Sequence, residues 1–136
     1  PLFDALDDTM GRDRWIKLRE TGQIEIAPLA YMRGRTLHDC CMLLDEAQNT
    51  TPTQMKMFLT RLGEGSRCFV TGDVTQCDLP RGQRNGLKDA VETLEGLRDI
   101  EIVHFHESDV VRHPLVSTIV SAYNEKDRQI TLKLDE

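Results

Sequence analysis

The sequence predicts an α/β protein built on a parallel sheet with helices on both faces. Apolar, β-prone runs begin near residues 40, 68 and 101, about thirty residues apart. A helical pattern lies between each pair of runs, as crossovers between parallel strands require. At 136 residues, the chain has the length of one domain with its own core. We therefore expect a single domain over residues 1–136.

In the first third of the chain, the sequence pattern predicts helical structure followed by two strands. Residues 1–22 carry apolar side chains at helical spacing, and Gly11 and Gly22 are plausible stops. The segment 23–29, QIEIAPL, predicts a short strand. The run 40–44, CCMLL, is apolar throughout, which is typical of a strand covered on both faces.

The next helix carries clear boundary signals. Thr51 is a suitable cap, Pro52 suits the first helical position, and Gln54 completes a capping box. The run 67–71, RCFVT, predicts the following strand. Apolar residues from Leu87 to Leu97 then recur at helical spacing.

The last third predicts one more strand and one more helix. The strand is IEIVHF, residues 100–105. Pro114 opens a helix that we expect to run through Tyr123. For residues 125–136 we expect an edge strand or a flexible tail, because QITLKL alternates apolar and polar residues.

Composition limits the classes of function. The net charge is −6, from 17 basic and 23 acidic residues, which argues against a protein that coats nucleic acid with its whole surface. A local basic groove is still compatible with this charge. The four cysteines show neither a CxxC pair nor zinc-ligand spacing, so we expect reduced thiols and a cytoplasmic protein. No apolar stretch approaches the ~20 residues of a membrane span.

Asp45 and Glu46 end the apolar run in CCMLLDEAQN. An acidic residue directly after a buried strand can orient Mg²⁺, usually through water, because Mg²⁺ gives up its hydration shell reluctantly. Glu46 can accept a proton from an attacking water, and Gln48 can help to position that water. The alternative is a solvated turn that caps the next helix. The apolar residues before the pair and the Ala-Gln after it favour the functional interpretation.

A second polar group follows the next strand, in VTGDVTQ. Gly72 allows a tight turn at the strand end, beside Thr71 and Asp73. The amide of Gln76 can donate and accept hydrogen bonds, which makes it a candidate sensor of a γ-phosphate. A Gly-Asp turn with an exposed glutamine is the alternative. Ligands of open parallel sheets bind beyond the carboxyl ends of the strands, so we expect these residues to lie near Asp45 and Glu46.

Three arginines complete the set of candidates. Arg112, in ESDVVRHP, precedes the helix opened by Pro114 and suits a sensor or arginine-finger role, with Glu107 and Asp109 available to orient it. Arg33 and Arg35 flank Gly34 and are candidates for contact with phosphate or RNA. A solvated loop explains them equally well. His104, His106 and His113 lack the spacing of a metal site.

Three segments together resemble the PhoH-like family of ATPases: LLDEAQNTTPTQMKMFLTRLGEGSR, VTGDVTQCDLPRGQ and DVVRHPLVSTIVSAY. The resemblance extends from about residue 1 to residue 123. It implies a nucleotide domain similar to the RecA-like core of superfamily 1 helicases, with ATP and Mg²⁺ as ligands. It also implies that Asp45 and Glu46 form the Walker B pair, that Gln76 senses the γ-phosphate, and that Arg112 is the arginine of the Val-Val-Arg-His motif. From their place at the strand ends, we expect the nucleotide to contact Asp45, Gln48, Thr71, Gly72 and Asp73.

The sequence has one serious departure from this pattern. A P-loop ATPase needs GxxxxGK[ST], whose amides and lysine cradle the phosphates, and the 136 residues do not contain it. In the resembled family that motif lies upstream. We therefore expect the chain to be the C-terminal portion of such a protein and to be inactive towards ATP by itself.

The resemblance also implies partners: RNA, an RNA-processing nuclease, and further copies of the protein in a ring. In a ring, Arg112 would act across a subunit boundary. Two other functions stay open from the sequence. One is a non-catalytic RNA- or nuclease-binding module on the same α/β shell. The other is a metal-dependent nuclease that uses Asp45, Glu46 and Asp73.

Overall fold

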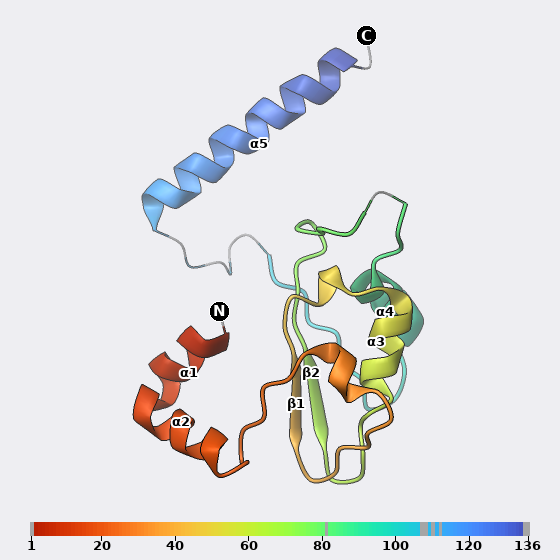
Figure 1. Ribbon diagram of the computed structural model, residues 1–136. Coiled ribbons are helices and arrows are strands. Elements are labelled where there is room, and N and C mark those ends of the chain that lie inside the picture. The colour runs from red at the N-terminus through yellow and green to blue at the C-terminus, as the bar shows by residue number, and fades with distance from the viewer. Residues whose placement is uncertain (1, 81, 107–108, 110, 112, 135–136) are drawn as a thin grey trace. The chain divides into compact units, whose positions relative to one another are not determined.

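The computed structural model describes residues 2–80, 82–106, 109, 111 and 113–134 (Figure 1). The chain divides into two compact units, Pro1–Glu101 and Ile102–Glu136. The first unit holds the sheet and most of the helices. The expectation of a single domain over residues 1–136 stays a prediction.

A parallel strand pair forms the centre of the first unit. Strand β1 (Cys41–Leu44) pairs with β2 (Arg67–Val70), with Cys41 opposite Arg67 and Leu44 opposite Val70. The connection between them contains helix α3 (Pro52–Leu59), so the two strands and their helix form the predicted crossover. The α/β class and the parallel pairing are therefore confirmed for this part of the chain.

Helix α3 begins where its sequence signals place it. The Thr51 hydroxyl accepts a hydrogen bond from the Gln54 amide, and the Gln54 side chain accepts one from the Thr51 amide at 2.8 Å. This capping box satisfies two amides that the first turn of a helix leaves unpaired. Pro52 occupies the first turn, where the missing N–H costs nothing.

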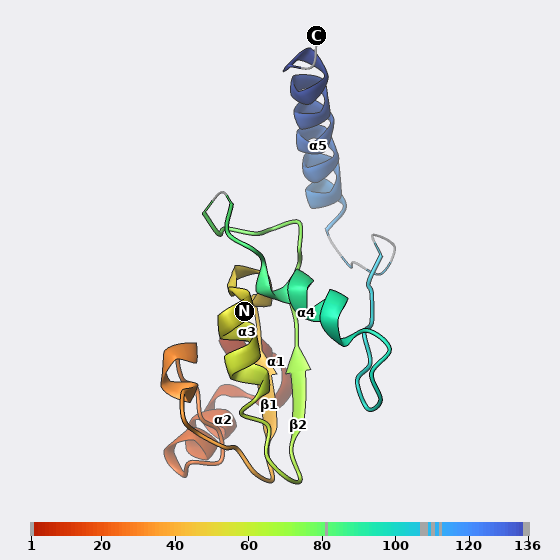
Figure 2. The same ribbon diagram turned by 90° about the vertical axis from the view of Figure 1, so that its right-hand side faces the viewer.

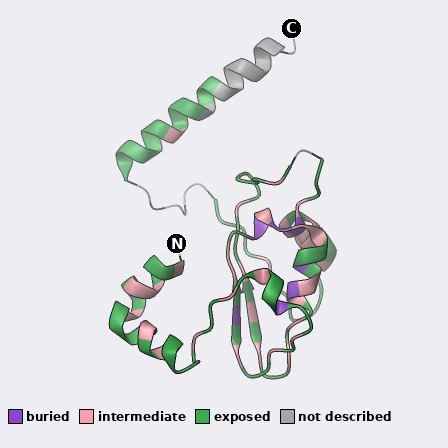
Figure 3. Cartoon of the chain, in the orientation of Figure 1, coloured by how far each residue is buried: buried purple, intermediate pink, exposed green. Residues whose placement is uncertain are grey.

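The core lies on one face of the sheet. Met42 of β1 packs with Phe58 of α3 and with Met32, which ends the short 3-10 helix η1 (Leu29–Met32). Each of these three side chains is buried (Figure 3). Cys40 and Cys68 pack at the edge of this cluster as small apolar side chains, and burial raises the pKa of the Cys68 thiol. Figure 2 shows α3 beside the strand pair and α4 (Gly86–Leu94) next to it.

The opposite face of the sheet is open in the described residues. Leu43 and Phe69 lie on that face and are 49% and 52% exposed. The prediction that helices cover both faces is therefore wrong for this part of the chain. A continuous apolar run cannot distinguish a strand covered on both faces from one whose second face lacks a partner.

Helices α1 (Leu2–Met10) and α2 (Arg12–Glu20) occupy the predicted helical stretch of residues 1–22, and the break at Gly11 is confirmed. Gly11 separates them with φ of 81°, a conformation that favours glycine. The rings of Phe3 and Trp15 lie 5.5 Å apart, and the indole N–H of Trp15 donates to Asp7 at 2.6 Å. The two helices therefore pack as a hairpin around the buried Trp15.

Two predicted strands are absent. Residues 23–28 form turns and irregular structure that lead into η1, and residues 100–105 have no regular structure. β-prone residues form a strand only where a neighbouring strand offers unpaired backbone groups. Among the described residues, β1 and β2 pair with each other and with no further named strand.

The second unit contains one long helix, α5 (Pro114–Leu134). Pro114 opens it as predicted, but it continues beyond Tyr123. The expectation of an edge strand is wrong for residues 125–134, which are helical, and the alternative of a flexible tail stays a prediction. Periodicity misled here because short alternating runs fit either structure. None of the described helices is long and apolar enough to cross a membrane.

Candidate functional site

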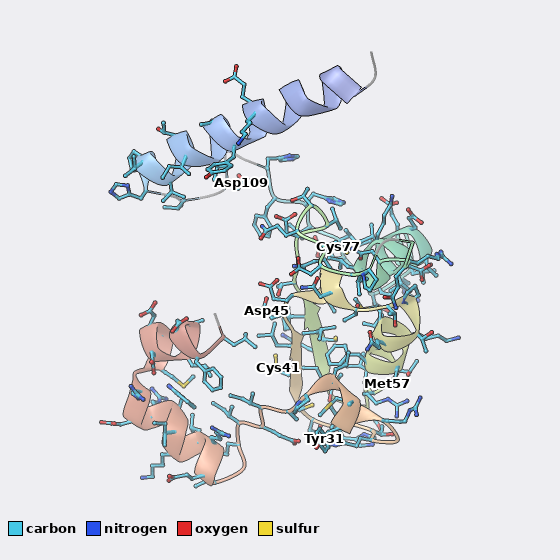
Figure 4. The ribbon with its side chains drawn as sticks, turned by 45° about the horizontal axis from the view of Figure 1, so that its top comes forward. Tyr31, Cys41, Asp45, Met57, Cys77 and Asp109 are labelled. Carbon is cyan, nitrogen blue, oxygen red and sulfur yellow. The ribbon has the colours of Figure 1, made fainter. Side chains whose placement is uncertain are left out.

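The predicted residues after β1 and β2 lie together because the backbone pairing continues past the strand ends. The Thr71 amide donates to the Leu44 carbonyl at 2.9 Å, and the Ala47 amide donates to the Thr71 carbonyl at 3.0 Å. The Thr71 hydroxyl also donates to Asp45 Oδ1 at 2.8 Å. Figure 4 shows Asp45 at the end of β1, towards the loop that carries Cys77. The structure therefore brings Asp45 and Thr71 into direct contact.

Glu46 adopts a strained backbone conformation at the turn after β1. Its φ of 53° and ψ of 38° are left-handed values, which cost a non-glycine residue about 1–2 kcal/mol. Such outliers persist where neighbouring contacts hold them, often at functional sites. Glu46 is exposed, and its Oε2 accepts a 2.6 Å hydrogen bond from Gln48 Nε2. The turn therefore presents an oriented carboxylate directly after Asp45.

Asp73 organises the loop that follows β2. Its Oδ1 accepts hydrogen bonds from the Thr75 amide and hydroxyl at 2.9 and 2.6 Å. Its Oδ2 accepts one from Gln76 Nε2 at 2.7 Å. Asp73 therefore holds the exposed side chain of Gln76, the predicted phosphate sensor, at the end of the sheet where Asp45 lies.

Gln48 is buried, although we predict it to contact nucleotide. Only 1% of its surface is exposed, and its amide is bonded to protein groups. Oε1 accepts from the Asp73 amide at 3.0 Å, and Nε2 donates to Glu46. Gln48 thus connects the two predicted motifs.

Sequence reasoning missed a second connection between these motifs. Asn49 Oδ1 accepts a hydrogen bond from the Asp78 amide at 2.9 Å. The Cys77 thiol donates to the Gln48 carbonyl at 3.4 Å. The one available signal was Asn49 itself, since asparagine side chains often bond to nearby loop amides.

The predicted arginines lie in different settings. Arg35 forms a bidentate pair with Glu25, with N–O distances of 2.6 and 2.8 Å. These hydrogen bonds lower the pKa of Glu25 and raise that of Arg35, so the Arg35 guanidinium is engaged by this carboxylate. Arg33 is exposed. Arg112 lies outside the described residues, as does Glu107, and Asp109 belongs to the second unit.

The donors at Asp45 suit Mg²⁺ bound together with phosphate. Mg²⁺ is usually held by one or two carboxylates, water and substrate phosphates. Asp45 offers one carboxylate, and no described residue donates to its Oδ2. Among the described residues there is no cluster of three His, Cys, Asp or Glu side chains able to hold a metal. Asp45 could therefore supply one carboxylate to a Mg²⁺ ion that also binds phosphate and water.

Comparison with known proteins identifies the family. The family model for PhoH-like proteins matches residues 1–124, most of the chain. The chain belongs to the PhoH-like family. The predicted resemblance is therefore confirmed, and the matched residues include every site residue discussed above.

Individual PhoH-like relatives are closely similar in sequence. The chain is 58% identical over 127 residues to the PhoH-like protein of Bacillus subtilis, covering 93% of the chain and 40% of that protein. It is 63% identical over 123 residues to the PhoH-like protein of Mycobacterium tuberculosis strain H37Rv, covering 90% of the chain and 35% of that protein. Protein PhoH of Escherichia coli K12 is 48% identical to the chain over 126 residues, covering 91% of the chain and 36% of protein PhoH. The chain thus spans well under half the length of these PhoH-like relatives.

Proposed function

We propose that this PhoH-like chain supplies the Walker B carboxylates and the γ-phosphate sensor of an ATP hydrolase. The observation that carries the proposal is the site at the ends of β1 and β2. There the Asp45–Thr71 contact and the Gln48 bridge hold Asp45, Glu46 and the Gln76 loop in one arrangement. Membership of the PhoH-like family supports the same assignment.

In the proposed reaction each side chain has a separate task. Asp45 would hold a Mg²⁺ ion through water, and its Oδ2 is the oxygen that Thr71 does not bind. Glu46 accepts a proton from the water that attacks the γ-phosphate, while the bond from the γ-phosphorus to the bridging oxygen breaks and ADP leaves. The hydrogen bond from Gln48 fixes the orientation of Glu46. Gln76 contacts the γ-phosphate through its amide, in competition with Asp73. Bound Mg²⁺ would neutralise charge on the β- and γ-phosphates.

The remaining parts of the proposal concern the whole protein. We propose that β1 and β2 belong to a RecA-like P-loop core whose phosphate cradle lies outside these 136 residues. The protein would work in the cytoplasm, couple ATP hydrolysis to RNA metabolism alongside a nuclease, and assemble as a ring in which Arg112 reaches a neighbouring site. These parts are supported by the family and by the helicase-like order of the motifs in the sequence.

The alternative functions receive less support. A non-catalytic binding module has no need for an exposed glutamate in a left-handed turn beside a second carboxylate. The nuclease hypothesis needs Asp73 as a metal ligand, but the Asp73 carboxylate already accepts hydrogen bonds from Thr75 and Gln76. The described residues also contain no three-carboxylate cluster.

The Asp45→Asn variant of the full-length protein tests the metal assignment. The substitution keeps the size and the contact with Thr71 but removes the charge. We expect the Mg²⁺ concentration for half-maximal ATP hydrolysis to rise about 10- to 100-fold, because outer-sphere partners contribute that much to metal affinity. Initial rates of ATP hydrolysis, measured over a range of Mg²⁺ concentrations, give this half-maximal concentration.

Asp8→Asn is the matched control, since Asp8 is exposed on α1 and lies outside the site. It should leave the magnesium titration unchanged. An Asp45→Asn titration that coincides with that of Asp8→Asn would remove Asp45 from the metal-binding role.

A further inference from the structure

Gln48 occupies the contact point between the two halves of the proposed site. It lies in the 3-10 turn η2 (Ala47–Asn49), directly after the turn that carries Glu46. Its side chain is 99% buried, yet it ends in a polar amide. A buried amide costs free energy unless its donor and acceptor are both satisfied. Its partners therefore reveal what the residue does.

The hydrogen-bond partners of the Gln48 amide belong to both motifs of the site. On one side Nε2 donates to the Glu46 carboxylate at 2.6 Å. On the other, Oε1 accepts from the Asp73 amide at 3.0 Å, and Nε2 approaches the Gln76 carbonyl at 3.5 Å. One side chain thus joins the proposed proton acceptor to the loop that carries the proposed sensor.

The Gln48 amide lies so close to Gly72 that there is no free space for a side chain at that glycine. A Cβ atom on Gly72 would lie 2.5 Å from Gln48 Oε1 and 2.9 Å from Leu87 Cδ2, which is closer than real contacts allow. A side chain at position 72 would therefore force the Gln48 amide and Leu87 to move.

The far end of the loop is attached to the same turn. Cys77 donates to the Gln48 carbonyl, and the Asp78 amide donates to Asn49. Gln76 lies between these attachments and the one at Asp73. Residues 48 and 49 therefore determine the position of the Gln76 side chain.

We propose that Gln48 is a positioning residue that holds Glu46 and the loop 73–78 in register, so that the proton acceptor and the sensor engage one phosphate together. This inference rests on the proposed ATP hydrolysis. It assigns Gln48 to coupling within the protein and not to direct contact with nucleotide.

The first arm of the test measures kinetics of the full-length protein. Gln48→Met keeps the length of the side chain and removes both hydrogen bonds. We expect kcat to fall about 100-fold, the effect of a misplacement of roughly 1 Å, while KM for MgATP changes less than about threefold. Gln83→Met is the control, because Gln83 is exposed and its side chain bonds to no described residue. Equal kcat values for the two variants would overturn the proposal.

A double-mutant cycle separates coupling from a general loss of structure. If Gln48 acts partly through the loop, Gln48→Met and Gln76→Ala should be non-additive, so that the double variant loses less activity than the product of the single losses. Losses that multiply would show that the two residues act independently, which contradicts the proposal.

The second arm needs no enzymatic activity. In Gln48→Met, amide hydrogen exchange of the peptide covering residues 71–80 should become roughly five- to tenfold faster, as expected for a lost hydrogen bond. Gln48→Glu keeps an acceptor for the Asp73 amide but places a second carboxylate against Glu46. In that variant kcat should also fall, because the contact with Glu46 becomes repulsive.

Gly72→Ala provides a further variant should Gln48→Met fail to fold. The added methyl group collides with Gln48 Oε1, so the same acceleration of exchange and the same fall in kcat are expected. If the wild-type protein does not hydrolyse ATP, the proposed function fails, yet the exchange arm still tests the bridge. Exchange that is unchanged in both Gln48→Met and Gly72→Ala overturns the bridge itself.

Discussion

Replacing Glu46 with glutamine in the full-length protein is expected to lower kcat for ATP hydrolysis by about 10²- to 10⁴-fold, the usual contribution of general base catalysis. Glutamine keeps the size of the side chain and can still bond to Gln48, so the turn after β1 should survive. Binding of MgATP should change little, because the proposed role of Glu46 is exerted on the attacking water. Steady-state phosphate release and equilibrium binding of ATP measure the two effects.

The control for this variant is Glu64→Gln, an identical change at an exposed glutamate in the connection before β2. It should hydrolyse ATP at the wild-type rate. Hydrolysis that is equal in Glu46→Gln and Glu64→Gln would remove Glu46 from the catalytic role and return it to the status of a solvated turn residue.

Truncating Phe58 to alanine is expected to lower the free energy of unfolding by about 3–5 kcal/mol. Phe58 is 5% exposed and packs against Met32 and Met42, so the substitution leaves a cavity between α3 and β1. Because Asp45 directly follows β1, part of the activity should be lost with the fold. Chemical denaturation of the full-length protein measures the change.

Lys56→Ala is the comparison for Phe58→Ala, since Lys56 is exposed in the same helix. Its effect should stay within about 0.5 kcal/mol. A loss below about 1 kcal/mol for Phe58→Ala would mean that the face of β1 covered by α3 does not form the core described above.

The parallel strand pair and its crossover could be predicted because their signals are local. Thr51, Pro52 and Gln54 define the start of α3 through a capping box, and that box is present. Once two strands are known to be parallel and connected by a helix, their carboxyl ends must lie at one edge. The contact between Asp45 and Thr71 follows from that topology.

Features that depend on distant partners could not be predicted in this way. Residues 23–28 and 100–105 are β-prone, but a strand exists only where another strand pairs with it. The exposure of Leu43 and Phe69 likewise depends on what lies opposite, and an apolar run carries no information about that.

Within the candidate site, the sequence predicts that the residues after the two strands lie together, but it does not predict the contacts between them. The sequence places Gln48 two residues after Glu46, but the burial of Gln48 depends on the path of the loop after β2. The same holds for Asn49, whose bond to Asp78 joins residues 29 positions apart. Such contacts depend on three-dimensional proximity that no spacing in the sequence encodes.

The central claim is that Asp45, Glu46 and Gln76 belong to an ATP-hydrolysing site. The most direct measurement is phosphate release from ATP by the purified full-length protein, with Mg²⁺ and with Mg²⁺ removed by a chelator. We expect turnover that requires Mg²⁺ and is abolished by the chelator. Absence of turnover above the uncatalysed rate in the presence of Mg²⁺ would contradict the claim.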